Sequence, residues 1–126
     1  MSAITVTNTG KNLLRAGRSG ADNPKVTYIA LGTGSTAPSA SDTKLAAEVF
    51  RKKITSYTNG GTGEILANGY IGPTEAVGTI IAEVGFFGGN SASSTANSGI
   101  LIARGLYSHT KTSTESLTLQ FDETIS

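Results

Sequence analysis

The sequence of 126 residues contains no cysteine and no tryptophan, a single histidine and few charged side chains. The absence of cysteine excludes a disulfide scaffold, a cysteine-ligated metal centre and a thiol nucleophile. With one histidine, a metal site would have to take nearly all its ligands from carboxylates. Ten Lys and Arg against nine Asp and Glu give a net charge of +1. This balance excludes a protein that binds nucleic acid through a strong basic excess.

Long apolar runs are also missing, since none exceeds four residues. A transmembrane helix needs about 20 apolar residues, so we expect no membrane span and no membrane partner. The first residues, Met-Ser-Ala-Ile-Thr-Val, do not have the basic and then apolar stretches of a signal peptide. We therefore expect synthesis in a cytoplasm.

Small and β-favouring residues are abundant instead, with 16 Gly, 18 Thr and 14 Ser. Such a composition is typical of short strands joined by turns. The apolar pattern predicts strands at 25–31, 54–58, 64–71, 79–87, 100–107 and 114–125. Asn59-Gly60, extended by Gly61-Thr62-Gly63, is a strong hairpin signal. In the strand at 79–87, alternation places Ile80, Val84 and Phe86 on one face, and Ile81, Glu83 and Phe87 on the other.

Two short helices are predicted in the N-terminal half. Thr7 or Asn8 can cap a helix that ends at Gly17 in a left-handed conformation. Ser39 and Asp42 resemble a capping box before a second helix over 42–50. We therefore predict one domain, residues 1–126, of mainly β class: an antiparallel β-sandwich-like fold with two short helices. Its apolar share of 37% is low, so we expect it to bury further surface against copies of itself.

Two patterns resemble catalytic or ligand-binding motifs, and each has a plainer interpretation. Gly32-Thr33-Gly34 follows a predicted strand as a phosphate-binding loop does, but no complete nucleotide motif is present; the alternative is a tight turn with positive φ. Ser108, His109 and Asp122 offer the groups of a hydrolytic triad, but adjacent Ser and His side chains point apart. The alternative is an exposed surface histidine. We expect no catalytic residue, no metal, no cofactor and no enzymatic activity.

Glu83 and Arg104 each stand inside an otherwise apolar strand. A charge among apolar neighbours is costly unless it is paired, so we expect the two residues to meet across a hairpin. They would act either as a general acid or ligand contact, or as a partly buried pair that fixes the strand register. We favour the second interpretation.

Polar segments are the candidates for contacts with other molecules. The basic run Arg51-Lys52-Lys53 would contact phosphates or acidic lipids, or form a solvated edge that discourages strand pairing. The loops at 32–41, 60–63 and 88–98 are rich in small and polar residues, and such loops commonly carry recognition. The 88–98 loop has almost no apolar residue, so we expect it to be mobile until a neighbour orders it. We expect Arg51, Lys52, Lys53, Asn90, Ser93 and Asn97 to lie at or near intermolecular contacts.

Several short motifs occur in a characteristic order. They are Thr7-Asn8-Thr9-Gly10, Gly32-Thr33-Gly34, Leu45-x-x-Glu48-x-x-Arg51, Ala82-Glu83-Val84-Gly85-Phe86-Phe87, Leu101-Ile102-Ala103-Arg104, and Lys111 with Leu117-Thr118-Leu119. In this order they resemble the phage tail-collar fibre family, in which the domain is the N-terminal attachment portion of a tail fibre. The resemblance covers nearly the whole chain.

The resemblance implies a non-enzymatic structural protein of a bacteriophage virion, made in the bacterial host cytoplasm. It implies a homotrimer that attaches to the tail or baseplate through protein–protein contacts, without nucleic acid or membrane. Because the sequence ends at Ser126 without a fibre shaft or tip, we expect a short appendage or an adaptor. The alternative is a trimeric capsid decoration (head-fibre) protein bound to the major capsid protein.

Overall fold

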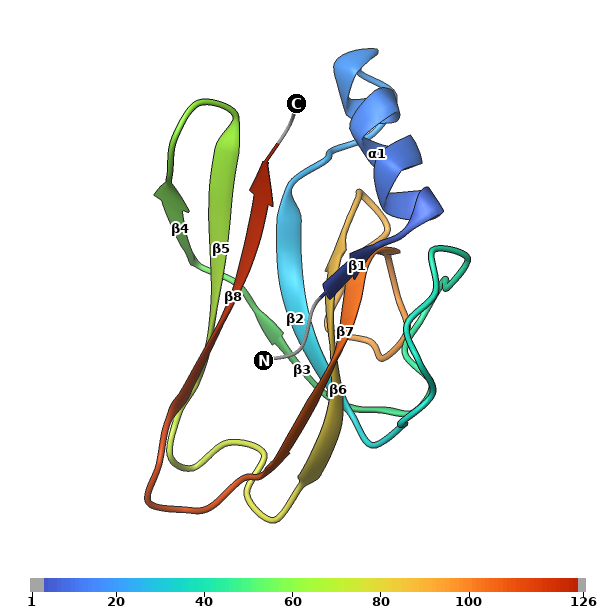
Figure 1. Cartoon of the computed structure of the whole chain (residues 1–126). Coiled ribbons are helices and arrows are strands. Elements are labelled where there is room, and N and C mark those ends of the chain that lie inside the picture. The colour runs from blue at the N-terminus through green and yellow to red at the C-terminus, as the bar shows by residue number, and fades with distance from the viewer. Residues whose placement is uncertain (1–3, 125–126) are drawn as a thin grey trace.

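The computed structural model describes residues 4–124, which form a mainly β fold with two antiparallel sheets (Figure 1). The larger sheet has the strand order β1-β7-β6-β2-β3 and the smaller one β4-β5-β8. The strands of the larger sheet are β1 (Ile4–Val6), β2 (Val26–Gly32), β3 (Glu48–Lys53), β6 (Ile80–Gly88) and β7 (Ile100–Thr110). Those of the smaller sheet are β4 (Ser56–Asn59), β5 (Glu64–Ile71) and β8 (Leu117–Thr124).

The first predicted helix is present as α1 (Asn8–Arg18) and packs against β7. Thr7 is its N-cap, and the Thr7 hydroxyl accepts a hydrogen bond from the Gly10 amide at 3.0 Å. The C-terminal end differs from the prediction: the C-cap is Ser19, and the left-handed residue is Gly20, with φ of 80°. Gly17 instead lies against the Pro24 ring, where a Cβ would approach to 2.4 Å. Within residues 4–124, no helix is long and apolar enough to cross a bilayer.

The second predicted helix, over 42–50, is wrong. The Ser39 amide does donate to Asp42 Oδ2 at 2.9 Å, as in a capping box, but residues 39–42 form only a turn and no helix follows. The amides of Ala46 and Ala47 donate to a side-chain carboxylate of β6 and so are not available to a helix. The chain then enters β3 at Glu48.

The six predicted strands are present, five of them with shifted ends. β5 has the predicted bounds, and the Asn59-Gly60 hairpin joins it to β4. The basic run 51–53 lies inside β3 rather than before a strand, and Ile54 links β3 to β4. The last predicted strand begins three residues later than expected, at Leu117, and its predicted end at Ile125 lies outside the described residues.

The main hydrophobic core contains side chains from both sheets. Phe86 of β6 stacks on Phe121 of β8 with ring centroids 5.1 Å apart. Ile81 belongs to this core together with Val84 and Phe86, although simple alternation placed it on the opposite face. A β-bulge between Ile81 and Glu83 shifts the register by one residue and reverses the facing.

A second, smaller core lies on the other face of the larger sheet. Leu45, from the irregular 33–47 loop, packs there against Ala30, Phe87 and Leu101. The polar groups that hold this loop in place form the first candidate site.

Candidate functional site

Glu83 and Arg104 form a buried ion pair. Arg104 Nε lies 2.8 Å from Glu83 Oε1, and the side chains are 2% and 0% exposed. The same guanidinium donates to Asp42 Oδ2 at 3.2 Å and to the Thr36 carbonyl at 2.8 Å. The two residues do meet across the β6–β7 hairpin, and they are fully rather than partly buried.

The Glu83 carboxylate also fixes the 33–47 loop. Its Oε2 accepts hydrogen bonds from the amides of Gly34 and Ala47 at 2.9 and 2.8 Å, and its Oε1 accepts one from the Ala46 amide at 2.9 Å. Burial alone raises the pKa of Glu83, but these bonds and the guanidinium together hold it below its ordinary value. An ionised carboxylate with four donors is saturated, so it is built as an anchor rather than as a general acid.

The Gly32-Thr33-Gly34 motif makes room for this carboxylate. A Cβ would lie 2.5 Å from Glu83 Oε2 at Gly32 and 2.6 Å from it at Gly34. Neither glycine has a positive φ, so the prediction of a left-handed turn is wrong. The motif needs glycine because a buried side chain approaches the backbone closely.

Arg51 forms a second buried charge cluster with Glu48. Its guanidinium makes two bonds to the Glu48 carboxylate, at 2.8 and 2.9 Å, and both side chains are at most 3% exposed. It also donates to the carbonyls of Ser93 and Ser98, at 3.1 and 2.8 Å, and lies 4.2 Å from the Phe87 ring centroid. Arg51 is therefore neither a solvated edge residue nor free to bind a partner, which corrects both interpretations of this position.

The 88–98 loop is held from within the chain. Besides the contacts of Arg51, the Asn97 amide donates to Glu48 Oε1 at 3.2 Å and the Asn90 amide donates to Asp22 Oδ1 at 2.7 Å. The expectation that a neighbour must order this loop is therefore wrong, because its anchors are charged rather than apolar. The side chains of Asn90, Ser93 and Asn97 are exposed.

The other two basic residues of the run lie differently. Lys52 Nζ is 2.5 Å from Glu75 Oε1 and 5.2 Å from the Tyr70 ring centroid. Lys53 is exposed at the end of β3. Of the three, Lys53 is the residue most available to a partner.

Lys111 is a buried cation that the sequence pattern did not reveal. It is 1% exposed, and its ammonium donates to the carbonyls of Pro73 and Thr112 at 3.2 and 2.7 Å. Its own amide and carbonyl bond to Thr79 and Gly78. Lys111 thus joins the β5–β6 and β7–β8 connections. Its position in the sequence, directly after β7, gives no signal of such a role.

Ser108, His109 and Asp122 do not form the catalytic triad that their residue types suggested. His109 Nε2 lies 2.7 Å from Glu115 Oε1, and its ring stacks on Tyr107 at 5.9 Å. The Thr112 amide and His109 lower the pKa of Glu115. The carboxylate beside His109 is therefore that of Glu115 rather than Asp122. Among the described residues, no group of three or more side chains is placed to hold a metal ion.

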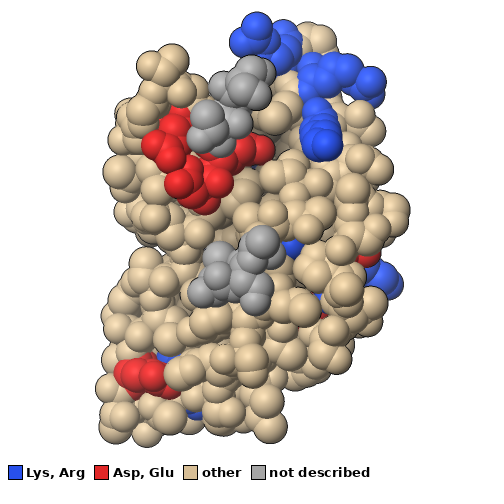
Figure 2. Space-filling model, in the orientation of Figure 1, with Lys and Arg blue, Asp and Glu red and all other residues tan. Residues whose placement is uncertain are grey.

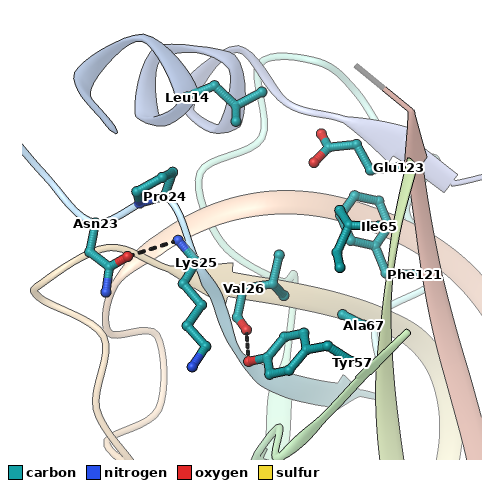
Figure 3. Close-up of a pocket in the computed structure, with 10 residues that line it drawn as sticks. All are labelled: Leu14, Asn23, Pro24, Lys25, Val26, Tyr57, Ile65, Ala67, Phe121 and Glu123. Atoms are coloured by element: carbon teal, nitrogen blue, oxygen red, sulfur yellow. Dashed lines mark hydrogen bonds between the residues drawn. The ribbon is translucent and has the colours of Figure 1, made fainter. Parts of the chain in front are cut away.

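An apolar pocket of about 370 Å³ opens between α1, the start of β2 and the smaller sheet (Figure 3). Its apolar walls are Leu14, Pro24, Val26, Ile65, Ala67 and Phe121. Tyr57, Lys25, Asn23 and Glu123 complete the lining. No sequence motif marks this site, because its lining residues come from five separate segments.

The surface beside this pocket is strongly charged. Figure 2 shows acidic side chains gathered where β5 begins and β8 ends, and basic side chains over α1. The acidic residues there are Glu64, Asp122 and Glu123. The neighbouring carboxyl group of Glu64 raises the pKa of Asp122, and burial raises the pKa of Glu123.

In comparisons with known proteins, no family model and no curated protein matches this chain.

Proposed function

We propose that this chain is a non-enzymatic structural protein of a bacteriophage virion, an attachment or appendage module of the tail-fibre and collar type. It would act through protein–protein contacts made by its exposed loops. We also infer that its two sheets pack as a β-sandwich, since Phe86 and Phe121 meet across them.

The observation that carries the proposal is the convergence of the motifs behind the resemblance. Gly34, Glu83 and Arg104 come from three different motifs and meet in one buried network. Glu48 and Arg51, which belong to a fourth motif, pair with each other and hold the 88–98 loop. Gly34 and Glu83 are 49 positions apart in the sequence and share this network. This supports the view that the motifs form one structural signature.

The use of charge also supports a scaffolding role. The buried Glu83 carboxylate and Arg51 guanidinium bond to backbone atoms of the 33–47 and 88–98 loops. These charged groups therefore hold surface loops in place and do not face a reactant. Both loops carry exposed polar residues. Loops fixed on a rigid sheet are the usual place for recognition.

We propose that the functional form is a homotrimer. Light scattering of the purified chain at micromolar concentration should then give three times the monomer mass of 12.9 kDa. A stable monomer under these conditions would contradict the trimer.

The location in the particle is tested by labelling. Purified particles of the phage that carries this sequence would be imaged with an antibody to the chain. Label at the tail end supports the attachment role, and label on the head assigns the chain to capsid decoration instead. Particles without this chain, by labelling and by mass spectrometry, would overturn a virion role.

A further inference from the structure

The apolar pocket beside α1 contains one carboxylate, that of Glu123. Figure 3 shows this carboxylate pointing across the pocket toward Leu14, between the helix and the smaller sheet. The remaining walls near it are aliphatic or aromatic. A cavity of about 370 Å³ lies within the roughly 300–1,000 Å³ range of ligand-binding clefts.

Glu123 has no cationic partner among the described residues, since none of their ion pairs includes it. Lys25, the lysine of the lining, is occupied elsewhere: its Nζ lies 5.1 Å from the Tyr57 ring centroid and points away from Glu123 (Figure 3). Three other glutamates contrast with this, because Glu48, Glu83 and Glu75 each have a cation at hydrogen-bond distance. Burial of the unpaired carboxyl raises its pKa, as expected for a charge without compensation.

Two further carboxyl groups, those of Asp122 and Glu64, occur near Glu123 in the smaller sheet. Asp122 precedes Glu123 on β8, Glu64 precedes Ile65 on β5, and the Glu64 carboxyl group raises the pKa of Asp122. Because side chains alternate along a strand, Asp122 and Glu64 lie on the face of the smaller sheet opposite to the pocket-lining Ile65 and Glu123, where Figure 2 shows acidic side chains gathered. A cation inside the pocket would therefore be recognised by the Glu123 carboxylate alone.

We propose that this pocket binds a lysine or arginine side chain presented by a protein partner. The methylene stem of such a side chain would lie against Leu14, Ile65 and Phe121, and its cationic head would meet the Glu123 carboxylate. A purely apolar group would fill the same walls but leave Glu123 unpaired. The proposal goes beyond the proposed function and does not depend on where the chain sits in a particle.

The test is a methyl-resolved NMR titration with two small probes, Nα-acetyl-lysine N-methylamide and its norleucine counterpart, which lacks the ammonium group. The lysine probe should shift the methyl signals of Leu14, Val26, Ile65 and Ala67, with an affinity about tenfold above that of the norleucine probe. Equal affinity of the two probes, or shifts confined to other parts of the molecule, would overturn the proposal.

Two variants and one further probe sharpen the experiment. Glu123→Gln should reduce lysine-probe binding to the norleucine level, while Glu115→Gln, before the opposite end of β8, should leave it unchanged. Retained preference for lysine in Glu123→Gln would contradict the assigned role of Glu123. Free lysine should bind more weakly than the capped probe, because its charged α-amino and α-carboxylate groups would lose hydration against the apolar walls. Tighter binding of free lysine would point to a small-molecule site and overturn the protein partner.

Discussion

Glu83 and Arg104 are diagonal neighbours in the β6–β7 ladder. Glu83 faces Leu106 and Arg104 faces Gly85, yet Nε and Oε1 are 2.8 Å apart. Diagonal positions on one sheet face are within reach of a long side chain. Because the carboxylate also binds loop amides, this pair connects the hairpin to the 33–47 loop.

Arg104→Ala should destabilise the protein by about 3–5 kcal/mol, because it leaves a buried carboxylate without its cation. Urea unfolding at neutral pH measures the loss. Lys52→Ala is the matched control: its pair with Glu75 is about one-third exposed, so its loss should be about 0–1 kcal/mol. Similar losses in both variants would contradict the anchoring role of the buried pair.

Gly34→Ala should cost about 1–3 kcal/mol through overpacking, because the new Cβ would lie 2.6 Å from Glu83 Oε2 and 2.4 Å from the Ala46 Cβ. Gly61→Ala is the control, since its Cβ meets nothing closer than 4.0 Å and its change should stay within about 0.5 kcal/mol. Thermal unfolding of both variants gives the comparison. An unaffected Gly34→Ala protein would show that the loop does not need this close approach.

Arg51→Lys should loosen the 88–98 loop while keeping the charge. Lysine cannot reproduce the two bonds to Glu48 together with those to the loop carbonyls, because it lacks the planar guanidinium. Hydrogen exchange of the amides at 90–98 should become faster than in the wild type, and Lys53→Ala should not change it. Unchanged exchange in Arg51→Lys would mean that other contacts hold the loop.

Glu123→Gln should make the protein more stable than the wild type at pH 7, with the difference disappearing at acidic pH. Burial raises the pKa of Glu123 above its ordinary value of 4.5 in the folded state. The carboxyl group therefore costs no stability well below that value, where it is protonated in both states. It destabilises the folded state as the pH rises through its folded-state pKa. Urea unfolding of both proteins at pH 4 and pH 7 measures this. A variant less stable than the wild type at pH 7 would show that Glu123 has a cationic partner in the folded chain.

Six of the eight described strands and the hairpin were predictable because they depend on local properties, whereas β1 and β3 were not predicted. The apolar pattern at 64–71 and the Asn59-Gly60 turn fix β5 and its pairing with β4. The Thr7 cap is likewise a contact within one helical turn. The Glu83–Arg104 pair was predictable for a different reason: a charge inside an apolar strand requires a partner.

What the tertiary structure decided depends on contacts between distant segments. The region 42–50 has a cap and an apolar spacing suited to a helix, but the Glu83 carboxylate, more than 30 residues away in the sequence, takes the amides that the helix needs. The bulge before Glu83 reverses the facing of Ile81, and no residue type marks it. Arg51, Lys111 and Glu123 look like ordinary surface charges in the sequence. Their burial, and therefore whether they have partners, is decided only when the two sheets and the loops pack together. Desolvation depends on the surroundings of a residue in the folded protein and not on the residue type.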